Sequence, residues 1–135
     1  MKKDLDYFRE LGRDSLPGHL GVVVTSVSPT EIRLDMPVTR HLMAPNGFLH
    51  AGSVISLADS ACGYGCIVNL PDKAKGFTTI ELKSNHLGTV RDGNIYALAT
   101  PVHLGKTTQV WDANVFCTES GKRLAVFRCT QMILY

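Results

Sequence analysis

One segment, residues 51–69, constrains the fold of this chain more than any other. Its apolar residues recur with helical spacing, so it is predicted to be a long helix, yet Ala, Gly and Ser dominate it. Small side chains permit close approach on nearly every side, while Gly63 and Gly65 each cost a helix about 1 kcal/mol relative to Ala. Such a helix is poorly stable alone and must be held by tertiary contacts.

Strand-like runs lie on both sides of this helix. In residues 31–38 apolar and polar side chains alternate without a break, which predicts a half-buried antiparallel strand with one wet face. A short amphipathic helix over residues 3–12 and a turn at residues 16–19 are expected before the first strand. The order implies an α+β fold with an antiparallel sheet wrapped around one central helix. The expected strands are residues 21–27, 31–38, 77–86, 94–104, 107–117 and 123–134.

Bulk properties narrow the class of protein. The 135 residues suffice for one domain with a core, residues 1–135, in which residues 1–20 form the N-terminal helix and turn. A net charge of +2 gives no broad basic field for nucleic acid. No apolar run approaches the ~20 residues of a membrane span and no signal peptide is recognisable, so a cytoplasmic protein without membrane contact is expected. Cys62 and Cys66, at i and i+4, are poorly spaced for a disulfide or zinc, and no metal site is predicted.

Asp59 is the one carboxylate within the predicted central helix. On a helical wheel it lies at the edge of the apolar stripe, among small neighbours that leave room for a ligand. Half-burial would raise its pKa toward the range useful to a general base or nucleophile. From the wheel alone, a solvent-exposed Asp without function is equally consistent.

His50 directly precedes the helix. The first N–H groups of a helix lack internal partners and carry partial positive charge, so the amide of Ala51 or Gly52 could polarise a carbonyl oxygen. The helix start and Asp59 are roughly 12 Å apart along the axis, too far for both to act on one carbonyl from one subunit. The spacing therefore indicates that two subunits build each site.

Other polar residues are weaker candidates. Thr79 and His86 would lie on opposite faces of a regular strand, and either could line a pocket. Lys106, beside two threonines, could hold phosphate, although a solvated hairpin turn explains it as well.

Several motifs together resemble a known family. Asn46-Gly47-Phe48-Leu49-His50-Ala51-Gly52, the acid at Asp59 and the segment 79–87 resemble the hotdog-fold thioesterases. The PaaI-like branch of the 4-hydroxybenzoyl-CoA thioesterase superfamily is most similar, and the segment 101–111 resembles the enterobactin proofreading thioesterase. The similarity spans roughly residues 21–134.

The resemblance implies a hotdog fold, a homodimer with its sheets joined edge to edge, and commonly a homotetramer. The active site would lie at the dimer interface. Asp59 would be the nucleophile or general base, the Ala51 amide would polarise the thioester carbonyl, His50 would orient this region and Thr79 would position water. Coenzyme A would be part of the substrate, with no separate cofactor. The expected substrate-binding residues are Asn46, Gly52, Gly63, His86 and Lys106.

The chain departs from the family pattern at two positions. The usual His-Gly-Gly is here His50-Ala51-Gly52, which keeps the amide but adds a methyl group that could narrow the carbonyl slot. Ala44 stands where a Gln or Asn is usual, and Asn46 could substitute for it.

The expected function is hydrolysis of an acyl-CoA thioester, with an aromatic acyl group as one option. A hotdog dehydratase is an alternative that fits the motif less well. A non-catalytic acyl-CoA sensor is a second alternative, although such sensors carry a DNA-binding domain for which the residues before Gly21 are too few. Candidates for coenzyme A contacts, by charge alone, are Arg91, Lys106 and Arg128.

Overall fold

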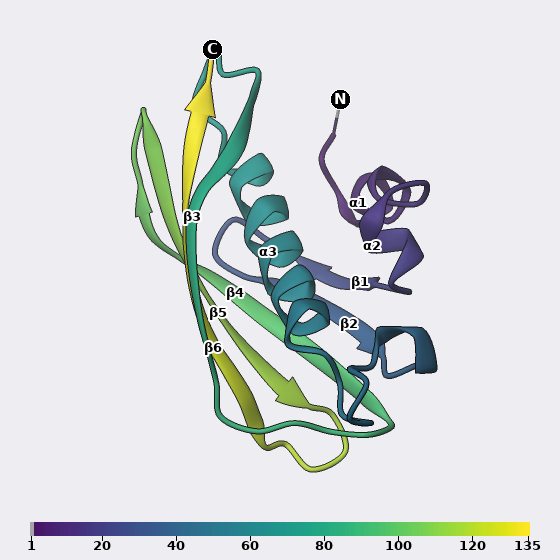
Figure 1. Ribbon diagram of the computed structural model, residues 1–135. Helices are drawn as coiled ribbons and strands as arrows, with labels where there is room; N and C mark the ends of the chain where they lie inside the picture. Colours follow the sequence, from purple (N-terminus) through teal and green to yellow (C-terminus); the bar gives the residue numbers. More distant parts are fainter. Residues whose placement is uncertain (1) are drawn as a thin grey trace.

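A computed structural model describes residues 2–135 and shows a curved antiparallel sheet wrapped around one long helix (Figure 1). The α+β architecture predicted from the sequence is confirmed. The elements are α1 (Leu5–Leu11), α2 (Leu16–His19), β1 (Val23–Val27), β2 (Ile32–Pro37), the 3-10 helix η1 (Arg40–Leu42), α3 (Ala51–Val68), β3 (Gly76–His86), β4 (Asn94–Leu104), β5 (Thr108–Cys117) and β6 (Arg123–Leu134).

The strands form a single sheet in the order β1-β2-β4-β5-β6-β3. All neighbouring pairs are antiparallel. The chain crosses from β2 through α3 to β3 on the far edge, so the helix lies over the sheet between its two outermost strands (Figure 1). The edge strand β3 pairs only with β6 in the part of the chain that the structure describes.

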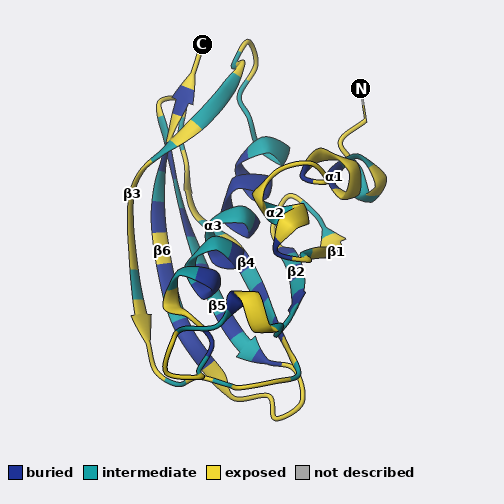
Figure 2. Ribbon diagram, turned by 45° about the vertical axis from the view of Figure 1, so that its right-hand side comes forward, coloured by how far each residue is buried: buried dark blue, intermediate teal, exposed yellow. Residues whose placement is uncertain are grey.

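Small residues let α3 lie close against the sheet. A Cβ on Gly65 would lie 2.4 Å from the fully buried Trp111 ring, and one on Gly63 would lie 3.0 Å from Phe77. Buried residues concentrate on α3 and the middle strands, whereas β3 is mostly exposed (Figure 2). The close approach therefore explains why a helix poor in large side chains is stable here.

The apolar character of α3 also has a second reading. Its 18 residues have a mean hydropathy of 1.3, which by length and composition would suffice to cross a membrane. Half of that stretch is buried within the chain, as in the core helix of a globular fold.

Most element boundaries agree with the sequence prediction, and one does not. Residues 16–19, expected as a turn, form the single helical turn α2, with a proline in its first turn. Proline is well tolerated there because its missing N–H has no helical partner in any case. The prediction of a plain turn was wrong at this point.

A bulge in β3 overturns a second expectation. Thr79 pairs with Gln131 and Glu81 with Thr130, so two residues of β3 oppose one of β6. The extra residue shifts the alternation, and His86 pairs with Ala125, on the same sheet face as Gln131. Thr79 and His86 therefore share the face toward α3 and do not lie on opposite faces.

Candidate active site

His50 is the N-cap of α3 and fixes the geometry of the helix start. Its ring Nδ1 accepts a hydrogen bond of 2.7 Å from the Gly52 N–H, and its carbonyl accepts from the N–H groups of Ser53 and Val54. Because Nδ1 is an acceptor, Nε2 carries the proton of the neutral ring. A Cβ at Gly52 would lie 2.9 Å from Nδ1, so the glycine makes room for this cap.

The Ala51 amide is the N–H at this helix end that the His50 cap does not bind. Within residues 2–135 its N–H has no hydrogen-bond acceptor, and the residue is exposed. Of the two donors left open by the sequence, Gly52 is occupied by His50 and Ala51 is available. A helix N-terminus with an available N–H favours a developing negative charge on oxygen.

Asp59 lies two turns further along α3, about 12 Å from Ala51 along the axis. It is half-buried, and its Oδ1 lies 3.2 Å from Thr79 Oγ1 on β3. Burial raises the pKa of Asp59, and the Thr79 hydroxyl partly opposes that rise. The structure thus brings together two of the four residues predicted to be catalytic, and it leaves Ala51 and His50 at the other end of the helix.

Sequence reasoning missed a residue behind this pair. Gln131 of β6 is fully buried, and the Thr79 hydroxyl donates to its Oε1 at 2.7 Å. Its Nε2 donates to Cys129 Sγ at 3.4 Å. The sequence carried a signal for this residue. Gln131 is polar, whereas the next helix-facing positions of β6 on either side, Cys129 and Ile133, hold apolar side chains.

Two of the predicted substrate-binding residues have structural partners. Asn46 uses its side-chain oxygen to accept from the Phe48 N–H, which stabilises the loop before α3. Gly63 is buried and faces Phe77. Their roles in binding stay predictions.

Two others lie away from Asp59. His86 is exposed at the last residue of β3. Lys106 lies in the hairpin between β4 and β5, where its carbonyl accepts from the Tyr135 hydroxyl. Within one subunit the structure therefore does not gather His86 and Lys106 around the Asp59–Thr79 pair.

Two arginines predicted by charge alone differ in availability. The Arg91 guanidinium lies 4.3 Å from the centre of the Phe48 ring, next to the loop that leads into α3. Arg128 is held by Asp112, with Nη2 to Oδ2 at 2.9 Å. Arg91 thus lies beside the loop that leads to Ala51, whereas Arg128 is engaged by Asp112.

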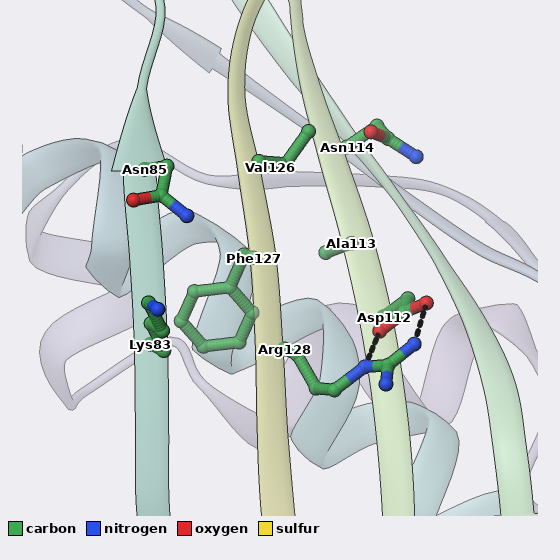
Figure 3. A pocket seen from close by; sticks show the side chains of 8 residues that line it. All are labelled: Lys83, Asn85, Asp112, Ala113, Asn114, Val126, Phe127 and Arg128. Carbon is green, nitrogen blue, oxygen red and sulfur yellow. Dashed lines mark hydrogen bonds and ion pairs between the residues drawn. The ribbon is translucent and has the colours of Figure 1, made fainter.

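A hollow of about 290 Å³ lies on the sheet face opposite α3, where the Arg128–Asp112 pair is one of its walls (Figure 3). Neither Ala51 nor Asp59 lines it. In the described chain, 2–135, no cluster of three His, Cys, Asp or Glu side chains is suited to hold a metal ion.

Comparison with known proteins identifies the family. The model of the thioesterase superfamily matches residues 46–124, from the loop before α3 through to the start of β6. The chain belongs to the thioesterase superfamily. The matched region contains both Ala51 and Asp59, and the predicted thioesterase is confirmed at the level of the family.

Individual relatives agree in sequence and in structure. A 1,4-dihydroxy-2-naphthoyl-CoA hydrolase of Listeria monocytogenes is 32% identical over 112 residues, covering 82% of this chain and 89% of that protein. The 1,4-dihydroxy-2-naphthoyl-CoA hydrolase of Escherichia coli is 29% identical over 136 residues, covering 98% and 96%. A mutant thioesterase of Pseudomonas aeruginosa superposes with a TM-score of 0.91 at 28% identity, covering 97% and 94%. The expected hotdog fold is confirmed by such neighbours.

Proposed function

We propose that this protein hydrolyses an acyl-CoA thioester, with Asp59 as the attacking or activating group and the Ala51 amide as the carbonyl-binding donor. The observation that carries the proposal is the half-buried Asp59 carboxylate against Thr79, on a helix whose first amide has no acceptor within residues 2–135. Burial raises the pKa of Asp59, which makes its ionised form a stronger base than a solvated Asp.

Two routes lead to the same products. In one, Asp59 takes a proton from water while the water oxygen attacks the carbonyl carbon; the carbon–sulfur bond then breaks and the thiolate of coenzyme A leaves and takes up a proton. In the other, an Asp59 oxygen attacks first and forms a mixed anhydride, which water hydrolyses. Both need Asp59 ionised, and both place negative charge on the former carbonyl oxygen, where an N–H donor stabilises it.

An aromatic acyl group is the proposed substrate class. Two relatives are named as hydrolases of an aromatic acyl-CoA thioester, 1,4-dihydroxy-2-naphthoyl-CoA. Phe48 offers an aromatic side chain in the loop directly before Ala51. Arg91, stacked on Phe48, is the proposed contact for a phosphate of coenzyme A. The substrate-binding roles of Asn46, Gly52, Gly63, His86 and Lys106 complete this part of the proposal.

A homodimer is the proposed working unit, with a homotetramer as its larger form. The roughly 12 Å between the Ala51 amide and Asp59 is too long for one carbonyl, so each site would combine Ala51 of one subunit with Asp59 of its partner. The eleven-residue edge strand β3 supports this arrangement, because unpaired strand edges readily pair with another chain. Its Ile80 and Leu82 are 51% and 40% exposed.

The test is release of coenzyme A from a panel of aromatic and aliphatic acyl-CoA thioesters. We expect Asp59→Asn to lower kcat by about 10²–10⁴-fold, the usual cost of removing a positioned acid or base. Asp72→Asn, at an exposed position beyond the end of α3, is the matched control and should leave turnover unchanged. Full activity in Asp59→Asn would sink the proposal. Tight acyl-CoA binding by the unaltered protein without any turnover would favour the sensor instead.

A further inference from the structure

Two buried glutamines lie side by side on the sheet face toward α3, and they are used differently. Gln109 of β5 and Gln131 of β6 are directly paired, and both are fully buried. Gln109 accepts from Trp111 Nε1 at 2.8 Å and donates to the Asn69 carbonyl at 2.9 Å, so it ties the core to the end of α3. Gln131 has Thr79 as its oxygen partner. Gln131 therefore contacts the neighbour of Asp59, and within residues 2–135 its other side-chain hydrogen bond goes to Cys129 of the same strand.

The Thr79 hydroxyl has one proton and two acceptors within reach. Its oxygen lies 2.7 Å from Gln131 Oε1 and 3.2 Å from Asp59 Oδ1. A hydroxyl proton serves the nearer acceptor first. The Gln131 Nε2 donates to Cys129 Sγ, so the Oε1 of the same amide is the atom that faces Thr79. The proton therefore points toward Gln131, and a lone pair of the Thr79 oxygen remains for the site.

We propose that Gln131 is a positioning residue: by taking the Thr79 hydroxyl proton, it leaves Asp59 with an incompletely satisfied carboxylate and turns Thr79 into an acceptor for the attacking water. The inference rests on the proposed role of Asp59. With both Asp59 and Thr79 as acceptors, the two protons of one water are held, and its oxygen is free to attack carbon. Charge on Asp59 is then less stabilised than it would be with the hydroxyl pointing at it, which keeps it basic.

Among the groups that face Asp59, the hydrogen bond between Thr79 and Gln131 is the one that a substitution can alter. On α3 the titratable neighbour is Cys62, whose pKa is raised by burial and by the adjacent Cys129 of β6. The charged residues of β3 nearest Thr79 in sequence, Glu81 and Lys83, are in register with Thr130 and Arg128, on the sheet face away from α3. From β6, the polar group toward Asp59 and Thr79 is Gln131.

The test follows the acid limb of the pH profile of kcat/KM, which reports ionisation of Asp59. In Gln131→Met the Thr79 proton turns to Asp59, so we expect the limb to move about one unit to lower pH and kcat/KM on the plateau to fall about tenfold. In Thr79→Val no hydroxyl proton is left to turn to Asp59, so the limb should not move to lower pH. In the double variant, Gln131→Met should add no further shift to Thr79→Val. Gln131→Asn, which retracts the amide by one carbon, replaces the Met variant if that does not fold.

Gln109→Met is the matched control, since it removes an equally buried amide from the paired position. It should lower stability and leave the acid limb in place. If Gln131→Met also leaves the limb in place, or moves it to higher pH, the assignment of the Thr79 proton is overturned. The same holds if the shift persists when Thr79 is Val.

A carboxyl titration by NMR separates this proposal from the proposed function. The Asp59 carboxyl signal, identified by its loss in Asp59→Asn, should titrate at lower pH in Gln131→Met than in the unaltered protein. An unmoved titration would overturn the role of Gln131 and leave the thioesterase proposal intact. Full activity in Asp59→Asn together with a moved titration would overturn the catalytic role of Asp59 and leave the hydrogen bond as assigned.

Discussion

At the scale of single residues, Asp59 is placed where a charge is costly. Burial is the main cause of its raised pKa. A carboxyl group with a higher pKa in the folded than in the unfolded chain binds its proton more tightly when folded, so stability from this group falls as pH rises through that interval. The chain therefore gives up stability at neutral pH to keep a basic carboxylate.

Asp59→Asn should accordingly make the protein more stable while it lowers activity. We expect a higher melting temperature than the unaltered protein at pH 7–8, because the variant avoids the buried charge. The gain should shrink as pH falls and vanish below about pH 4, where the unaltered carboxyl is protonated in both states. Thermal unfolding between pH 3 and 8 measures this. A stability gain that is independent of pH would show that the buried charge is not its source.

At the scale of elements, the start of α3 combines a structural cap with a free donor. His50 satisfies the Gly52 amide and leaves the Ala51 amide open, so one residue stabilises the helix while its neighbour faces the solvent. Ala51 is the first helical residue after the cap. This position tolerates proline well, because proline lacks only an N–H that the helix does not use.

Ala51→Pro is therefore a clean test of the carbonyl-binding donor. The substitution removes the amide proton, and the extended backbone of His50, with φ −66° and ψ 136°, suits a following proline. We expect the helix content and melting temperature to stay close to those of the unaltered protein, while kcat falls by about 10²–10³-fold. Circular dichroism and steady-state kinetics check the two parts. Ala51→Ser, which keeps the N–H, is the control; equal losses in both variants would point to the side chain instead.

The elements also show where sequence reasoning succeeds. The limits of α3 could be read from the small-residue pattern, and the alternation in β2 predicted which of its side chains are buried. The bulge at Ile80 and Glu81 could not be read, because an extra residue in a strand leaves no local signal when the sequence near it is a mixture of polar and apolar types. Gln131 could have been noticed as a polar residue at a helix-facing position of β6, but its contact with Thr79 could not be read, because Thr79 is 52 residues away and only the pairing of β3 with β6 brings the two together.

At the scale of the whole molecule, the proposed site depends on two copies. The helix places the Ala51 amide and Asp59 about two turns apart, and a straight helix holds them at that separation. If each site takes one group from each subunit, two chains that carry different inactivating substitutions can together form one intact site.

Mixed dimers of Ala51→Pro and Asp59→Asn provide this test. In a mixed dimer one site contains both substitutions and the other contains neither, so random exchange should restore about a quarter of full activity. The two chains are unfolded together, refolded and assayed against each variant alone. If both groups belonged to one subunit, every site in the mixture would lack one of them and no activity would return.

The bulge divides β3 into two segments, and the alternation of side chains between the sheet faces is offset by one residue from one segment to the other. Residues before it align with the reacting side chains, and residues after it align with the outer end of the sheet. A single deletion at Ile80 would remove the extra residue, so Thr79 would still pair with Gln131 and Glu81 with Thr130, and both segments would keep their present faces in a regular ladder. The bulge thus lets β3 carry one residue more than its pairing with β6 needs, without changing which of its side chains face Asp59.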